Sequence, residues 1–92
     1  MTSNQASTTI KDLQVIPGVG PRIAGKLATI GIHSVSDLVD KNPDMLYQKL
    51  CKQEDLIVDP CVLYVFRCAV YFANHQQHDP EKLKWWYWKD HT

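Results

Sequence analysis

The chain has 92 residues, of which 45% are hydrophobic and 22% are charged. This size and composition build one globular domain with a single core and leave no room for a separate catalytic domain. Its 10 basic and 10 acidic side chains cancel, which excludes the large positive excess of a strong nucleic-acid binder. The longest apolar stretch, residues 61–73, is interrupted by Arg67 and is too short to span a membrane, and the N-terminal residues contain no secretory signal. We therefore expect a cytoplasmic protein without membrane contact.

The first residues differ in composition from the rest of the chain. Residues 1–8 are polar and lack apolar periodicity, so we expect a disordered tail there, followed by a single domain over residues 9–92. Thr9 or a neighbouring Ser or Thr is placed to cap a first short helix that runs to about Val15.

The run Ile16–Pro21, Ile-Pro-Gly-Val-Gly-Pro, is the most informative part of the sequence. Gly18 and Gly20 permit a positive φ and close backbone approach, and Pro21 suits the first position of a helix. The sequence thus predicts two short helices joined by a tight turn, with the second helix ending near Gly31. The N–H groups of such a turn and the positive end of the following helix dipole make an anion site that needs no side chain.

Further helix starts recur along the chain, each marked by a capping residue. They predict a short third helix from Ser34 through Val39, a fourth from Asn42-Pro43, a fifth and longest from Asp59-Pro60 to about Asn74, and a last short turn from Asp79-Pro80 before the aromatic run 85–88. In the fourth helix, we expect Met45, Leu46 and Leu50 to point inward.

The fifth helix is expected to be central, because apolar side chains occupy most of its circumference at about 100° per residue. One cluster on this helix contains Cys61, Val65, Cys68 and Phe72, with Val62, Phe66, Ala69 and Ala73 beside it. No segment alternates with a period of two, and only residues 56–58 could form even a short strand. The predicted fold class is all-α.

The run Leu13–Leu38 closely resembles a helix-hairpin-helix motif: a Pro-Gly-hydrophobic-Gly turn, a small-residue helix with a lysine, and then Gly-Ile-x-Ser-Val-x-Asp-Leu. Residues 34–50 look like a degenerate second hairpin, in which Asp40-Lys41-Asn42-Pro43 replaces the glycine turn. Through the runs 61–72 and 83–90, nearly the whole chain after residue 8 also resembles the small bacterial pathogenicity-locus family, some of whose members are labelled mitomycin-resistance-like. The resemblance to that family gives a name for the domain but implies no activity.

The helix-hairpin-helix resemblance implies sequence-independent binding to the phosphate backbone of DNA. A single intact hairpin offers only a few phosphate contacts, so we expect an affinity in the micromolar range or weaker. It implies phosphate contacts at Gly18, Val19, Gly20, Ile23 and Lys26, to which Arg22 is added for its place in the first turn of the second helix. In several members of the motif family, the carbonyls corresponding to Gln14, Ile16 and Val19 hold a monovalent cation that bridges to phosphate. Gly25 departs from the motif and costs about 1 kcal/mol of helix stability relative to alanine.

Two other groups of residues have competing interpretations. Trp85, Trp86 and Trp88 could stack on bases or contact a partner protein, or they could fold back and close the core, although three tryptophans in four positions cannot all point inward. Cys51, Cys61 and Cys68 match neither a disulfide framework nor the spacing of zinc ligands, so we expect buried, reduced thiols and no metal site.

Two functions therefore remain open. The first is DNA binding through the hairpin, and the second is a protein-interaction or adaptor module that uses the tryptophan-rich C-terminus without nucleic acid. We expect no catalysis and, apart from the monovalent cation at the hairpin, no cofactor.

Overall fold

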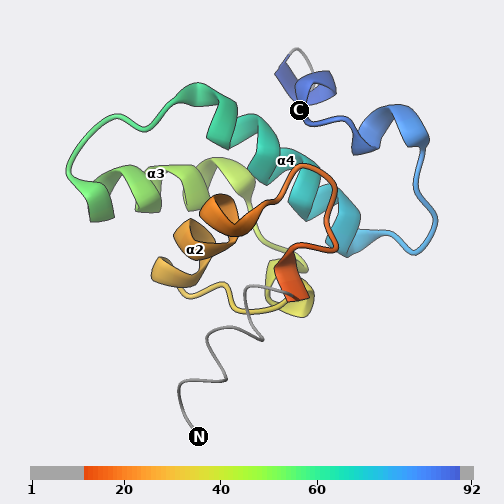
Figure 1. Cartoon of the computed structure of the whole chain (residues 1–92), viewed down its shortest axis with the longest axis horizontal. Helices are drawn as coiled ribbons and strands as arrows, with labels where there is room; N and C mark the ends of the chain where they lie inside the picture. The colour runs from red at the N-terminus through yellow and green to blue at the C-terminus, as the bar shows by residue number, and fades with distance from the viewer. Residues whose placement is uncertain (1–11, 90–92) are drawn as a thin grey trace, which may run out of the picture.

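The computed structural model describes residues 12–89, and every regular element in this range is helical. The elements are α2 (Pro21–Thr29), η1 (Val35–Leu38), α3 (Pro43–Glu54), α4 (Pro60–Asn74), η2 (Pro80–Leu83) and η3 (Trp85–Lys89), where η denotes a 3-10 turn (Figure 1). Residues 12 and 13 are also helical, while the expected helix start at Thr9 and the expected tail over residues 1–8 lie outside the described residues. The all-α prediction is confirmed for this range, and no helix in it is long and apolar enough to cross a membrane.

The helices α2, α3 and α4 all begin at a proline, as the sequence predicted. The side chain of Asn42 accepts hydrogen bonds from two first-turn N–H groups of α3, at 2.9 and 3.3 Å, and Asp59 accepts one from Cys61 at 2.9 Å. These caps satisfy N–H groups that have no acceptor inside a helix. Gly31, with a φ of +91°, follows the end of α2, so the predicted glycine stop is confirmed as well.

The segment after α2 differs from the prediction. Residues 35–38 form a single 3-10 turn, and the hydroxyl of Ser34 pairs with Ser36 at 2.9 Å instead of capping a helix. Asp37 accepts a hydrogen bond from the N–H of His33 at 2.9 Å, which lowers the pKa of its carboxyl. Both η1 and α3 pack on α4, and the first part of the expected second hairpin over residues 34–50 is a 3-10 turn rather than a helix.

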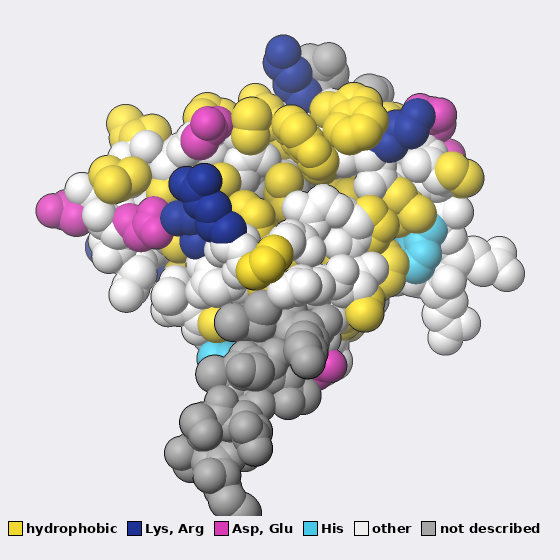
Figure 2. Space-filling model, in the orientation of Figure 1, with side chains coloured by type: hydrophobic (Ala, Val, Ile, Leu, Met, Phe, Trp, Pro, Cys, Tyr) yellow, Lys and Arg dark blue, Asp and Glu magenta, His cyan; other side chains and the backbone are white. Residues whose placement is uncertain are grey.

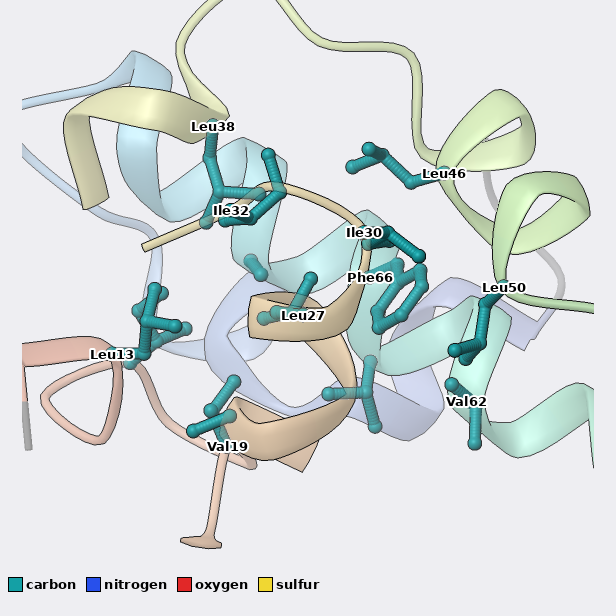
Figure 3. Close-up of a cluster of buried hydrophobic side chains, with 14 of the residues drawn as sticks. Leu13, Val19, Leu27, Ile30, Ile32, Leu38, Leu46, Leu50, Val62 and Phe66 are labelled. Atoms are coloured by element: carbon teal, nitrogen blue, oxygen red, sulfur yellow. The ribbon is translucent and has the colours of Figure 1, made fainter. Parts of the chain in front are cut away.

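The helix α4 lies at the centre of the fold, as its apolar circumference predicted. Figure 3 shows the fully buried Phe66 ring of α4 in one cluster with Leu27, Ile30 and Leu50, and α4 packs on α3, η1, η2 and η3. Two side chains that were expected to point inward do not: Met45 is 67% exposed, and Cys61 is exposed. Both lie in the first turn of their helices, where helical periodicity predicts the direction of a side chain but not whether another element covers it.

The C-terminal segment folds back onto α4 and closes the core. Arg67 Nη1 donates to the carbonyl of Trp88 at 2.9 Å, and Trp88 Nε1 donates to the carbonyl of Lys82, also at 2.9 Å. Trp85 packs against the core, with Cδ1 of its ring 3.3 Å from the position that a Cβ on Gly18 would occupy. The interpretation of the aromatic run as core closure is confirmed, and this closure brings η3 beside the turn that precedes α2.

Candidate functional site

The turn over residues 16–20, called the hairpin from here on, leads directly into α2. Inside it, the N–H of Val19 donates to the carbonyl of Ile16 at 3.0 Å. Gly18 has a φ of +87°, whereas Gly20 has a φ of −94° and is the N-cap residue of α2. Only the first of the two glycines therefore uses the positive φ that the sequence permitted for both.

The hairpin leaves several backbone N–H groups without an acceptor. In the described part of the chain, no acceptor takes the N–H of Gly18 or Gly20, and Gly18 is exposed. Ile23 stands in the first turn of α2, where N–H groups have no partner inside the helix. The N–H of Val19, in contrast, is used within the turn. Among these backbone donors, Gly18, Gly20 and Ile23 can still bind an anion, whereas Val19 cannot.

The three carbonyls that the resemblance implies for a monovalent cation belong to Gln14, Ile16 and Val19. The carbonyl of Ile16 accepts the Val19 N–H, while no N–H of the described residues is bonded to the other two. The carbonyl oxygens of Gln14 and Val19 thus have both lone pairs available, and that of Ile16 has one. This arrangement is compatible with a weakly bound cation. The cation site itself stays a prediction.

The two basic residues of α2, Arg22 in its first turn and Lys26 in its last turn, are opposed by carboxylates. Lys26 Nζ lies 2.8 Å from Glu54 Oε1, with 18% and 31% of the two side chains exposed. The N–H of Cys61 and, to a lesser degree, the charge of Arg22 lower the pKa of Asp59, so Arg22 acts within the field of that carboxylate. Lys26, which is held in an ion pair, thus presents less positive charge to a ligand than the sequence suggested. Glu54 is 28 positions away from Lys26, and no local pattern could have revealed the pair.

The three tryptophans are unequally available. Trp88 is 9% exposed and Trp85 is half-buried against the core, whereas Trp86 is 57% exposed. The expectation that at least one indole stays open is confirmed for Trp86. The predicted partner surface of three indoles is reduced to this single ring, because the core uses the other two.

The three cysteines have three different environments. Cys68 is buried, and burial raises the pKa of its thiol from 9.0 to about 11. Cys61 is exposed, and its hydrogen bond with the Asp59 carboxylate raises its pKa. Cys51 is half-buried, and its Sγ accepts the N–H of Val58 at 3.4 Å. The expectation of buried thiols is thus wrong for Cys61. Among the residues that the structure describes, no group of three or more His, Cys, Asp or Glu side chains is placed to hold a metal ion.

In the folded protein, Cys61 is expected to react with Ellman's reagent well before Cys68, because at about pH 8 a buried thiol is both shielded and almost fully protonated. The rate of nitrothiobenzoate release measures this difference in reactivity, and a first phase that persists in Cys61→Ser would contradict it.

The folded state holds the Cys68 proton more tightly than the unfolded state. The resulting stabilisation is complete below pH 9.0 and is lost as the pH rises towards about 11.

A groove of about 510 Å³ lies between the connection 40–44 and the second half of α4, and no residue of the hairpin lines it. Tyr71 and Trp88 contribute apolar surface to its wall, and Arg67 Nη2 lies 3.3 Å from Asp44 Oδ1 in the same wall. The sequence did not indicate this groove, because its lining comes from segments that only the fold brings together. The ion pair in its wall leaves it without a strong electrostatic preference.

The described residues thus form a small all-α domain with a hairpin in which the N–H groups of Gly18 and Gly20 are open, and with an aromatic C-terminal closure. The model of the pathogenicity locus family, Cdd1, matches residues 6–92, and the chain belongs to this family. It is also similar to the mitomycin resistance protein McrB of Streptomyces lavendulae, with 31% identity over 88 residues, which are 96% of this chain and 76% of that protein. A search of the solved structures finds no significant match.

Proposed function

We propose that the domain binds DNA weakly and without sequence specificity, through the hairpin of a helix-hairpin-helix unit. The observation that carries the proposal is the group of N–H donors on Gly18, Gly20 and Ile23, at and just before the start of α2, that have no acceptor among residues 12–89. Backbone donors at the N-terminal end of a helix bind phosphate oxygens without reading a base. The dipole of α2 adds positive potential at the same place.

We further assign α3 and α4 as the degenerate second half of this unit. In both halves a short connection leads to a helix that begins at proline, Pro21 in the first and Pro60 in the second. The connection of the second half, residues 55–59, contains no glycine and carries the carboxylates of Asp55 and Asp59. Because these carboxylates repel phosphate, DNA contact is limited to the first hairpin.

The ion pair of Lys26 and the carboxylate near Arg22 keep this site weak. With about one or two phosphates contacted, the logarithm of the binding constant should fall with the logarithm of the salt concentration with a slope of about −1 to −2. The expected affinity is micromolar or weaker at physiological salt.

Gly20→Asp tests the hairpin with little disturbance of the fold. Gly20 has a negative φ, and nothing lies within 4 Å of the position of an added Cβ. Aspartate is also a favoured N-cap residue, so its carboxylate should accept the open N–H groups of α2 and take the place of phosphate. We expect duplex binding, measured by fluorescence anisotropy at low salt, to fall at least about tenfold while the helix is retained.

The control for this experiment is Gly25→Ala, a glycine change on the same helix with nothing within 4 Å of the added Cβ. It should bind duplex like the unmodified protein. The proposal fails if the unmodified protein binds no duplex at high protein concentration, or if Gly20→Asp binds as tightly as the control.

Glu54→Gln is expected to strengthen DNA binding. The substitution removes the carboxylate that holds Lys26 Nζ at 2.8 Å and frees the ammonium for one more phosphate. Affinity should rise by about threefold to tenfold at low salt, and the salt slope should steepen by about one. Asp44→Asn is the matched control, because it removes an equal charge from the other end of α3. Equal gains in both variants would mean that only net charge matters and that Lys26 makes no local contact.

The protein-interaction alternative now depends on one exposed indole, that of Trp86. A pull-down with and without nuclease separates the two functions. Partners that survive nuclease and are lost in Trp86→Ala would favour the adaptor. The absence of catalysis and the cytoplasmic location stay predictions.

A further inference from the structure

Trp86 is connected to the hairpin through a single ring. Its indole and that of Trp85 are perpendicular, with an interplanar angle of 88° and ring centroids 5.7 Å apart. Trp85 in turn touches the hairpin, since its Cδ1 lies 3.3 Å from the Cβ position of Gly18. The exposed indole is therefore packed on a ring that contacts Gly18 of the hairpin, and it is not carried on a loose tail.

One side of the Trp86 ring remains open. A perpendicular neighbour covers at most one of the two faces of an indole, and 57% of this residue is exposed. A nucleic-acid base needs one free aromatic face on which to stack. Inside a duplex both faces of each base are already stacked on its neighbours, so only an unpaired base can use this ring.

Basic residues lie close to Trp86 along the chain. Figure 2 shows a group of hydrophobic side chains at the top of the molecule with Lys or Arg side chains near it. Lys84 Nζ lies 3.3 Å from Glu81 Oε1, but the two side chains are 45% and 69% exposed. Because an ion pair this exposed is weak, Lys84 can exchange the Glu81 carboxylate for a phosphate. Lys89, at the end of η3, is exposed as well. Cations beside an aromatic ring are the combination that single-strand binding proteins use.

We propose that this face takes single-stranded DNA, with a backbone phosphate on the hairpin and a neighbouring unpaired base stacked on Trp86. The inference rests on the proposed function, because the hairpin supplies the phosphate contact. A protein partner fits this surface less well. A stable protein interface buries about 800 Å² on each side, whereas Trp85 and Trp88 are committed to the core and leave one ring exposed.

The test compares three labelled probes at low salt: an oligothymidylate, a strand of the same length built from abasic residues, and a blunt duplex. Anisotropy gives the affinities, and quenching of tryptophan fluorescence reports stacking. The oligothymidylate should bind about 5 to 100 times more tightly than the abasic strand, which is the contribution of one stacked base. Trp86→Ala should remove this difference and Trp86→Phe should keep most of it. Ile57→Ala, which trims an apolar side chain that is 88% exposed elsewhere, should leave the difference intact.

The outcomes separate this inference from the function on which it rests. Gly20→Asp should weaken binding of all three probes, because each carries phosphate. If Gly20→Asp does so while Trp86→Ala leaves the preference for thymidylate over the abasic strand unchanged, DNA binding stands and the stacking inference is overturned. If no probe binds, both are overturned.

Discussion

Replacing Trp88 with alanine is expected to lower the free energy of unfolding by about 3–5 kcal/mol. The indole is 9% exposed, its centroid lies 5.6 Å from that of the Tyr71 ring, and Nε1 donates to the carbonyl of Lys82 at 2.9 Å. The substitution leaves a cavity between α4 and η3 and removes the stronger of two donors to the Lys82 carbonyl, which keeps only the Cys68 thiol at 3.6 Å. Since small domains are stable by only about 5–15 kcal/mol, the loss should be plain in urea unfolding followed by far-UV circular dichroism.

Trp86→Ala is the matched comparison, because it makes the same chemical change two positions earlier, on a side chain that is 57% exposed. It should alter the free energy of unfolding by no more than about 0.5 kcal/mol. Similar losses in the two variants would contradict the assignment of Trp88 to the core. The result also shows whether the Trp86→Ala variant remains folded, which the binding experiments require.

Gly18→Ala is expected to destabilise the domain by about 1–3 kcal/mol. The φ of Gly18 is +87°, a value that strains any residue with a Cβ, and the added Cβ would lie 3.3 Å from Cδ1 of Trp85. The hairpin must then either shift away from the ring or keep the strain. Thermal unfolding measures the loss, and DNA binding should weaken in parallel because the N–H groups of the hairpin move.

Gly25→Ala should change stability in the opposite direction. Gly25 lies inside α2 with nothing within 4 Å of its Cβ position, so no neighbouring helix requires a glycine there. Alanine should therefore raise the free energy of unfolding by about 0.5–1 kcal/mol through its better helix propensity. Shifts of the same sign in Gly18→Ala and Gly25→Ala would contradict the strain argued for Gly18.

The parts of the fold that could be predicted are those determined by neighbouring residues. Asn42-Pro43 and Asp59-Pro60 cap their helices within two or three positions, and Gly31 ends α2 through its own φ. Such features depend on the local chain alone. The hairpin belongs to the same class, and its Gly18 adopts the positive φ that the sequence allowed.

The parts that could not be predicted depend on contacts between distant segments. The pairing of Lys26 with Glu54 weakens the candidate site, yet each residue by itself suits its own helix. Met45 shares an inward-pointing pattern with Leu46 and Leu50, but no element covers it. Helical periodicity predicts the direction of a side chain, whereas burial and charge neutralisation are set by what the rest of the fold places opposite it.

The contact between Gly18 and Trp85 joins positions near the two ends of the described chain. Closing so long a loop costs more chain entropy than closing a local turn, and contacts of large sequence separation slow folding. On the ribosome, the turn over residues 16–20 is synthesised well before Trp85. A nascent chain therefore carries the turn without this contact until residue 85 has emerged.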